Sequence, residues 1–396
     1  MGWGAGLEHV RQLHVISGLG AGGAERALFN LLAGGLAAPG EAMVLSLLDR
    51  GCYGDRLEAL GIEVRTLDLK SPGGLAVALP RTRRLVDAFR PDLIQGWLYH
   101  GNLAATLAAR VARRHPALVW NVRNCLYSLS DWKLLTQQII RISRALSANV
   151  DAVIYNSELA RQQHEAFGFR TDVGHLIPNG FDVDALRPDA AVRLAERLAL
   201  DVSGETVLIG HVARFHPVKD HASFLRAAVR VAEARPRIEF LLAGMDVSVD
   251  NPALAGRVPP RLSDRFHFLG LRNDIHRLMQ ALDVLCQSSW SEAFPNVLGE
   301  AMALGIPCVA TAVGDSRSIL GDCGVLVPPR DSDALARGMI RLADMAPTER
   351  RRLGMRARSR VTERFALPAI VARYARLYQR LMAQVSPFGR STSDNG

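Results

Sequence analysis

The chain has 396 residues, of which 48% are hydrophobic and 22% charged, which is typical of soluble globular proteins with two or three domains. No apolar run reaches the roughly 20 residues of a membrane-spanning helix, and the first residues, MGWGAGLEHVRQ, do not resemble a signal peptide. The five cysteines are scattered and lack a C-x-x-C pair, which favours a reduced cytoplasmic protein over a disulfide or zinc scaffold.

The net charge of +9 is unevenly distributed. Residues 101–150 contain seven Lys or Arg and one acid, Asp131, whereas residues 350–380 contain ten Arg and one acid, Glu363. Basic surfaces of this kind bind nucleic acid, anionic lipid or phosphorylated substrates, but solvated helix faces have the same composition. Charge alone therefore leaves these interpretations open.

Short apolar runs alternate with helical patterns along two series. The first contains QLHVIS, AMVLSLL, VRTLDL, DLIQGWL, LVWNVR, AVIYNS and VGHLIPN, and the second runs from TVLIGHVAR to GVLVP, near Pro329. Strands separated by helices indicate βαβ units in parallel sheets, so two doubly wound domains are expected. The boundary falls in the Pro-, Gly- and Asp-rich stretch 177–190, and helical patterns follow the second series.

A glycine-rich turn, G-x-G-x-x-G at residues 18–23, follows the first predicted strand. An NAD site also requires an acid about 20 residues further on. Asp49 is 26 residues past Gly23, so a dehydrogenase is not favoured. Gly22 and Gly23 let the backbone approach a ligand, and a helix starting near Ala24 offers N–H groups to an anion. A simple tight turn remains the alternative.

The stretch SSWSEAFPNVLGEAMALGIPCVAT predicts a second anion site. Pro295 suits the first turn of a helix, where a missing N–H costs nothing. Three N–H groups would then lack a helical partner, those of Asn296, Val297 and Leu298. Glu292 precedes this helix and Glu300 lies inside it, so the two carboxylates are candidates to hold sugar hydroxyls. The alternative is a surface helix with two solvated acids.

His100 begins a helical pattern after the predicted strand DLIQGWL. A helix N-terminus lowers a histidine pKa, so we expect a neutral imidazole that can hydrogen-bond a hydroxyl of the transferred sugar. The alternative is a helix cap. Arg272 and Asp274 either border a nucleotide base or form a surface turn.

Five segments resemble, in order, the motifs of the retaining glycosyltransferases of family 4, which have the GT-B fold. SEAFPNVLGEAMA resembles the E-x7-E block, and GHVARFHPVKDH is similar to the donor-diphosphate loop, with Arg214 and Lys219 as its cations. GAGGAERALFNL resembles the N-terminal glycine loop, QGWLYHGNLAA the loop of the histidine, and LIPNGFDVDALRP the interdomain hinge. The resemblance covers residues 13 to about 330.

This resemblance implies an α/β fold of two Rossmann-like doubly wound domains facing a cleft, with a C-terminal helix that crosses back to the N-terminal domain. The implied boundaries are 1–180 for the acceptor-side domain, 190–365 for the nucleotide-sugar domain, 366–385 for the returning helix and 386–396 for a disordered tail. One departure, Ala293 in place of the more usual Gly, leaves the sugar selectivity at this turn open. The other, WLYHGN in place of an HxH pattern, suggests a bacterial surface-polysaccharide type.

The implied reaction is transfer of a sugar, with retention, from a nucleotide-diphosphate sugar to a hydroxyl of a glycan or lipid-linked acceptor. A UDP-sugar is favoured over a GDP-sugar. The implied catalytic residues are Glu292 and His100. The implied donor-binding residues are Gly22, Gly23, Arg214, Lys219, Phe294, Asn296, Val297, Leu298 and Glu300. A nucleotide-sugar epimerase or hydrolase on the same fold, or a non-catalytic binding protein, are the alternatives.

No metal ion is expected, because no Asp-x-Asp occurs at the end of a predicted strand and because Arg214 and Lys219 supply positive charge for the leaving diphosphate. The segment DWKLLTQQIIRISRALSAN has apolar residues at helical spacing next to Lys133, Arg141 and Arg144. It is either a core helix or, together with the basic cluster at 350–380, a surface for anionic lipid. The second interpretation predicts a cytoplasmic enzyme at the inner face of the membrane that binds no nucleic acid.

Overall fold

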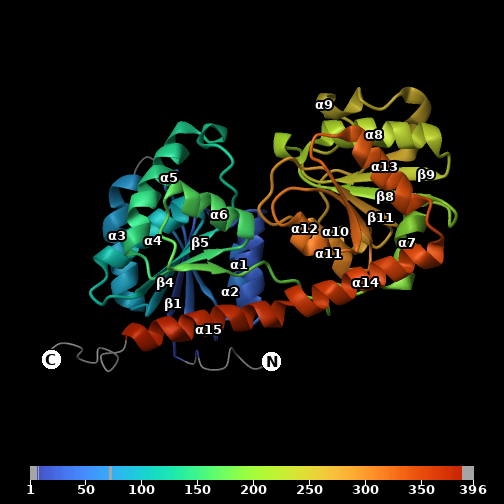
Figure 1. Ribbon diagram of the computed structural model, residues 1–396. Coiled ribbons are helices and arrows are strands. Elements are labelled where there is room, and N and C mark those ends of the chain that lie inside the picture. The colour runs from blue at the N-terminus through green and yellow to red at the C-terminus, as the bar shows by residue number, and fades with distance from the viewer. Residues whose placement is uncertain (1–6, 8, 71–73, 386–396) are drawn as a thin grey trace, which may run out of the picture. The chain divides into compact units, whose positions relative to one another are not determined.

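The computed structural model describes residues 7, 9–70 and 74–385, which form two α/β units (Figure 1). Unit 1 contains the described residues up to Gly180 together with the last helix, and unit 2 runs from Phe181 to Ala366. Residues 181–189, which separate the two domains expected from the sequence, belong to unit 2. The tail expected at 386–396 lies outside the described residues.

Unit 1 is built on a seven-stranded sheet with the order β3-β2-β1-β4-β5-β6-β7, in which every pairing is parallel. The central strands are buried along their whole length, as is usual when helices cover both faces of a parallel sheet. The strands are β1 (Gln12–Ile16), β2 (Ala42–Ser46), β3 (Glu63–Thr66), β4 (Leu93–Trp97), β5 (Ala117–Val122), β6 (Ala152–Tyr155) and β7 (Gly174–Leu176).

Helices cover both faces of this sheet. Leucines of α1 and α2 and the tyrosines of α15 share one apolar core with it, while α3 and α4 pack on the opposite face. The last helix therefore completes the core of unit 1 (Figure 1). The helices are α1 (Gly23–Ala33), α2 (Gly54–Glu58), α3 (Gly74–Phe89), α4 (Leu98–Val111), α5 (Leu134–Leu146), α6 (Glu158–Phe167) and α15 (Leu367–Val385).

Unit 2 has a six-stranded parallel sheet with the order β10-β9-β8-β11-β12-β13. One face packs against α11 and α14, and the other against α8 and α13. The strands are β8 (Val207–Val212), β9 (Ile238–Ala243), β10 (Phe266–Phe268), β11 (Val284–Gln287), β12 (Cys308–Thr311) and β13 (Gly324–Val327). The helices are α7 (Ala190–Ala199), α8 (His221–Ala234), α9 (Pro252–Ala255), α10 (Ile275–Met279), α11 (Asn296–Ala303), α12 (Ser316–Leu320), α13 (Ser332–Ala343) and α14 (Pro347–Phe365).

Each sheet has one point at which the strand order reverses, between β1 and β4 in unit 1 and between β8 and β11 in unit 2. Ligands of doubly wound sheets bind beyond the carboxyl ends of the strands at such points. The two doubly wound sheets expected from the sequence are confirmed. Their reversal points are the expected positions of bound ligands.

The described part of the chain contains no helix that combines the length and apolar composition needed to cross a bilayer. All five cysteines are free thiols, and four of them are buried.

Candidate functional site

The glycine loop follows β1 at the reversal point of unit 1. Gly22 caps α1 with an extended backbone, φ −126° and ψ 169°. A Cβ at Gly22 would overlap the carboxylate of Glu25, the third residue of the helix. Glycine at this position therefore lets Glu25 fold back over the helix start, where a carboxylate is stabilised by the helix dipole. An anionic ligand bound at Gly22 and Gly23 competes with this internal carboxylate.

His100 is the third residue of α4 and half-buried. Burial lowers its pKa below the usual 6.5, so the imidazole is neutral at pH 7. The sequence predicted this direction, but the cause is burial rather than the helix dipole. The start of α4 lies directly against β1, because a Cβ at Gly101 would stand 2.6 Å from the Val15 carbonyl oxygen. His100 and the glycine loop thus follow neighbouring strands.

Leu98, just before His100, has φ +63°, a left-handed conformation that is strained for a leucine. The turn from β4 into α4 is held there by close packing: a Cβ at Gly96 would overlap the Asn102 backbone. The strain is maintained by the neighbouring contacts, and it fixes the direction in which α4 and His100 leave the sheet.

Arg123, which the sequence analysis did not single out, is a buried cation just beyond β5. Its guanidinium donates to Asn121 Oδ1 at 3.2 Å and to Asn179 Oδ1, and it lies 5.3 Å from the centre of the Trp97 ring. Asn121 donates in turn to the hydroxyl of Tyr374 on α15, at 2.9 Å. Burial lowers the pKa of Arg123, while Tyr374 and Glu25 oppose that shift. Arg123 therefore connects the last helix electrostatically with the first turn of α1.

In unit 2 the predicted cations lie in the loop after β8. Arg214 is exposed, and Lys219 forms an ion pair with Glu292 through Nζ and Oε1. Burial lowers the pKa of His216, and the charges of Arg214 and Lys219 lower it further. Both cations therefore act on the same small region, as expected for groups that bind one anion.

The loop after β11 holds the cation loop in place. Trp290 donates its backbone N–H to the Val218 carbonyl and its indole N–H to the Pro217 carbonyl, both at 2.9 Å. The hydroxyl of Ser288 donates to the Lys219 carbonyl at 2.8 Å and lies 2.9 Å from Nε2 of the buried His211. These contacts, which local sequence patterns do not reveal, fix the backbone of Lys219 beside β11.

Ser289 holds the side chain of Glu292, and the loop after β12 packs against its backbone. Ser289 Oγ donates to Glu292 Oε1 at 2.7 Å. Gly314 has φ +50°, and a Cβ there would overlap the carbonyl oxygens of Glu292 and Ala293. Asp315 donates its N–H to the Ala293 carbonyl at 2.9 Å. The backbone at Ala293, where the family more often has Gly, is therefore tightly packed.

Helix α11 differs in detail from the sequence prediction. Pro295 is the cap residue rather than the first helical residue, and α11 begins at Asn296. From this position the Pro295 carbonyl accepts the Leu298 N–H at 3.1 Å, so the expectation of a Leu298 N–H available to a ligand is wrong. The N–H groups of Asn296 and Val297 lie in the first turn of α11, at the positive end of the helix dipole.

Glu300 and Phe294 are both buried, in different surroundings. Glu300, the fifth residue of α11, has Oε2 3.6 Å from Nε2 of His276. The ring of Phe294 lies 6.3 Å from Phe181 and 5.7 Å from Phe365 in the core of unit 2. A contact of Phe294 with a donor would therefore come from its backbone.

Two other sequence features have structural partners. Arg272 donates to both carboxylate oxygens of Asp274, at 2.8 and 2.7 Å, and this pair lowers the pKa of Asp274. The arginines of residues 350–380 divide between α14 in unit 2 and α15 in unit 1. Several of them also donate to backbone carbonyls, among them Arg350, Arg358, Arg360 and Arg373.

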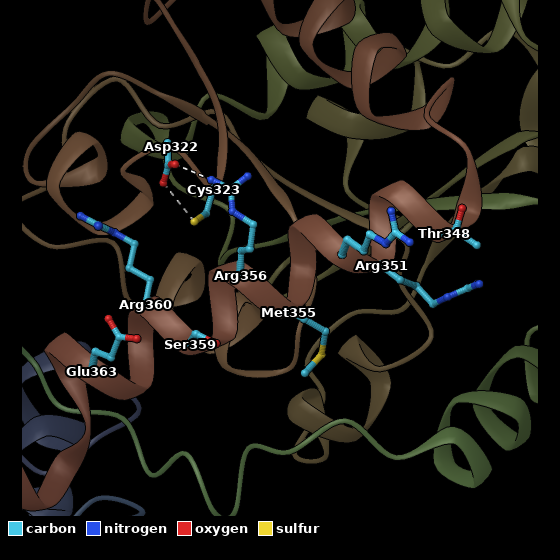
Figure 2. A pocket seen from close by; sticks show the side chains of 10 residues that line it. Asp322, Cys323, Thr348, Arg351, Met355, Arg356, Ser359, Arg360 and Glu363 are labelled. Atoms are coloured by element: carbon cyan, nitrogen blue, oxygen red, sulfur yellow. Dashed lines mark hydrogen bonds and ion pairs between the residues drawn. The ribbon is translucent and has the colours of Figure 1, made fainter.

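A hollow of about 900 Å³ lies between α14 and the turn before β13 (Figure 2). Arginines from successive turns of α14 border it, and Arg356 pairs there with Asp322. None of the predicted site residues lines it. Across the described residues, no group of three or more His, Cys, Asp or Glu side chains is arranged to hold a metal ion.

Comparison with known proteins agrees with this geometry. The model of the family "Glycosyl transferases group 1" matches residues 206–345, and that of "Glycosyltransferase Family 4" matches residues 21–185. A putative glycosyltransferase, EpsF of Bacillus subtilis, is 29% identical over 326 residues, which cover 80% of this chain and 82% of EpsF. A D-inositol 3-phosphate glycosyltransferase of a Mycobacterium species is 31% identical over 51% of this chain and 47% of its own length.

Among solved structures, HepE of Anabaena in complex with UDP and glucose superposes with a TM-score of 0.81 at 25% identity. The match covers 93% of this chain and 99% of HepE. Two doubly wound sheets, the two glycosyltransferase family models and the likeness to HepE define a glycosyltransferase of the GT-B class. The chain belongs to glycosyltransferase family 4.

Proposed function

We propose that this glycosyltransferase transfers a sugar from a nucleoside-diphosphate sugar, specifically a UDP-sugar, to an acceptor hydroxyl with retention of anomeric configuration. The observation that carries this proposal is the cluster at the β8/β11 reversal point, where Lys219 pairs with Glu292, the charges of Arg214 and Lys219 both act on His216, and α11 begins four residues after Glu292. HepE, which was solved with UDP and glucose, supports the choice of UDP.

In this proposal the diphosphate lies against the cations after β8 and the N–H groups of Asn296 and Val297. Positive charge fixed at this point stabilises the additional negative charge of the departing UDP, which is usually a large contribution to catalysis. Glu300 binds a ribose or sugar hydroxyl, and Glu292 binds the transferred sugar. Because these groups neutralise the diphosphate, the proposed site needs no metal ion.

On the acceptor side, Gly22 and Gly23 contact phosphate or sugar, and neutral His100 hydrogen-bonds a hydroxyl of the transferred sugar. In the front-face reaction that we propose, the bond from the anomeric carbon to the UDP oxygen breaks. A new bond to the acceptor oxygen forms on the same face. The acceptor proton passes to a phosphate oxygen of the donor, so no protein carboxylate becomes a covalent nucleophile.

The acceptor that we propose is a lipid-linked or polysaccharide-precursor glycan at the cytoplasmic face of the membrane. The likeness to EpsF and the departure WLYHGN support a role in bacterial surface-polysaccharide synthesis. Epimerase or hydrolase activity would instead consume the donor without an acceptor, which separates these alternatives from transfer.

A thermal-shift screen of nucleotide sugars tests the donor assignment. A ligand at 100 times its Kd stabilises the folded state by about 2.7 kcal/mol, which gives a measurable increase in Tm. UDP and UDP-sugars should raise the Tm more than GDP-sugars do. If GDP-sugars alone stabilise the protein, the UDP assignment is wrong. If no nucleotide stabilises it, the site assignment is wrong as well.

A further inference from the structure

Helix α5 of unit 1 has apolar residues on its buried side and also on its exposed side. Its inner face buries Ile139 and Ile140 in a small cluster with Tyr99 and Leu126, separate from the main cores of the unit. Its outer face exposes Leu134, Leu135 and Ile142, with 76%, 70% and 47% of their surfaces accessible. Leu135 and Ile142 are seven residues apart and therefore lie on one stripe, with Leu134 beside it. The core of unit 1 accounts for the inner face alone.

Exposed cations adjoin these apolar side chains. Lys133 immediately precedes Leu134, and Arg141 lies two turns after Leu134 on the same side of the helix. Within residues 127–146 the single acid is Asp131. The α5 outer face, which we define as Lys133, Leu134, Leu135, Arg141 and Ile142, thus combines apolar side chains with net positive charge.

This combination selects among the possible partners. A bilayer with anionic lipid offers hydrocarbon to the apolar side chains and phosphate to the cations, which is the pattern of helices that lie in a membrane interface. In a symmetric dimer the same surface meets itself, so Lys133 and Arg141 would meet like charges, which opposes association. The charge pattern therefore favours an anionic lipid surface over a second copy of the chain.

The position of α5 connects this face to the proposed site. Trp132, just before α5, meets the ring of Tyr99 edge-on at 5.5 Å between centroids. Tyr99 adjoins His100 in the first turn of α4, and α5 packs along α4 (Figure 1). The exposed leucines thus belong to the first turn of the helix that packs beside His100.

We propose that the α5 outer face is the membrane-docking surface of the enzyme. Leu134, Leu135 and Ile142 enter the boundary between headgroups and acyl chains, while Lys133 and Arg141 contact lipid phosphates. The inference rests on the proposed function in one respect, that docking brings the acceptor side of the enzyme to a lipid-linked substrate. The docking itself is independent of which sugar or nucleotide is used.

Vesicle flotation of the full chain tests the proposal. The probes are vesicles of phosphatidylcholine alone and of phosphatidylcholine mixed equally with phosphatidylglycerol, each at low and at high salt. The wild type should float with the anionic vesicles at low salt and much less at high salt, since exposed charges are screened. Equal, negligible flotation with both kinds of vesicle at low salt would overturn the docking proposal.

Two double variants separate the apolar and the charged parts of the face. The variant Leu134→Ser/Leu135→Ser should reduce partitioning to anionic vesicles by at least about tenfold, because it removes most of the inserted apolar surface. The variant Lys133→Gln/Arg141→Gln should bind both kinds of vesicle equally weakly and lose its salt dependence. Flotation like that of the wild type in both variants would place the docking surface elsewhere and overturn the assignment to α5.

Helix α7 of unit 2 supplies a matched control. Leu194 and Leu198 are 71% and 79% exposed, comparable with the leucines of α5. The neighbouring cations Arg193 and Arg197 are engaged with Asp283, at 2.8 and 3.0 Å. The variant Leu194→Ser/Leu198→Ser should therefore float like the wild type. If it loses binding as strongly as the α5 variant does, exposed leucines act without positional specificity and the proposal fails.

Two further measurements distinguish this inference from the proposed function. Calorimetric titration with UDP should give the same affinity for the wild type and for the α5 variants, which also shows that the variants are folded. If the wild type binds UDP but does not float, docking is refuted and the donor assignment stands. If it floats but does not bind UDP, docking stands and the donor assignment is refuted. Light scattering that shows a dimer abolished by Leu134→Ser/Leu135→Ser would identify the face as a self-association surface instead.

Discussion

Substitution of Lys219 by alanine tests whether the ion pair at the β8/β11 reversal point serves catalysis or folding. Lys219 pairs with Glu292, and the side chains are 24% and 15% exposed. The Lys219 backbone is fixed independently, by Ser288 and by the Trp290 contacts of the same loop. Lys219→Ala therefore removes the charge while the hydrogen bonds that hold the loop remain.

The two roles predict different magnitudes. Exposed ion pairs contribute about 0.2–1 kcal/mol to stability, and disruption of a buried pair costs about 3–5 kcal/mol. The Lys219–Glu292 pair is half-buried, so its loss should lower the free energy of unfolding by an intermediate amount, about 2 kcal/mol. Loss of one group that stabilises developing charge typically lowers kcat by about 100- to 1,000-fold, or roughly 3–4 kcal/mol. If Lys219 contacts the diphosphate, the catalytic loss exceeds the loss of stability.

The assay pairs a transfer rate with a denaturant titration on the same sample. Arg235→Ala is the control, because Arg235 forms an ion pair with Asp344 through two hydrogen bonds, at 3.0 and 2.8 Å, on the exposed surface of unit 2 and away from the proposed site residues. The control should leave the rate unchanged. A Lys219→Ala enzyme with a rate within about tenfold of the wild type, together with a clearly lowered stability, would show that the pair is structural.

Four further outcomes are expected. Glu300→Gln should weaken binding of the nucleotide sugar by about 1.5–3 kcal/mol through loss of a charge-assisted hydrogen bond; unchanged affinity in calorimetry would remove Glu300 from the site. Ser288→Ala should lower kcat more than it raises KM by releasing the Lys219 backbone, with partial recovery in Ser288→Thr; a loss of stability with unchanged kinetics would contradict a positioning role. Activity should persist in excess EDTA, and a complete loss restored by Mg²⁺ would refute the metal-free site. Desolvation lowers the pKa values of buried His14 and His164 to about 3 and 4, so both are neutral in the folded protein, whereas in the unfolded chain they become protonated below pH 6.5. The free energy of unfolding should therefore fall by about 2 kcal/mol for each histidine between pH 7 and pH 5. A thermal-denaturation series should show this slope, and His164→Gln should make it shallower.

The features that sequence reasoning found are encoded locally. The glycine loop, the cation loop after β8 and the block from Glu292 to Glu300 each occupy about a dozen consecutive residues. Their spacing reflects one turn or one helix start. The alternation of apolar runs with helical patterns also sufficed for the two doubly wound sheets, because parallel strands with helices between them leave few other topologies.

The features that it missed depend on register and long-range packing. Arg123 acquires its environment from Asn179 and from Tyr374, which is 251 positions later in the chain. Ser288 acquires its role from a carbonyl on the neighbouring strand's loop. The Leu298 prediction was wrong because a short bond to the carbonyl three residues earlier, that of Pro295, occupies the Leu298 N–H in the first turn. Helix boundaries of this precision depend on the tertiary contacts of the first turn.

In helix α5, too, the sequence pattern alone did not decide which residues are buried. The spacing of its apolar residues was compatible with a core helix and with a lipid-binding helix. The structure shows that Ile139 is buried whereas Leu135 and Ile142 are exposed. A pattern with a period of 3.6 residues states which side chains share a face, but the neighbouring element, here α4, decides which face is covered.

In each unit a cation of the chain interacts with a carboxylate of the chain itself. In unit 2 Lys219 is paired with Glu292, and in unit 1 the charge of Glu25 acts on Arg123. A bound phosphate therefore competes with an internal anion, and its affinity is the difference between two interactions rather than the full value of one. This arrangement favours turnover under the proposed mechanism. The bound donor has to share Lys219 with Glu292, whereas the departing UDP carries more negative charge and gains more from the same cation. An interaction that grows between ground state and transition state raises kcat, while one of equal strength in both would only lower KM.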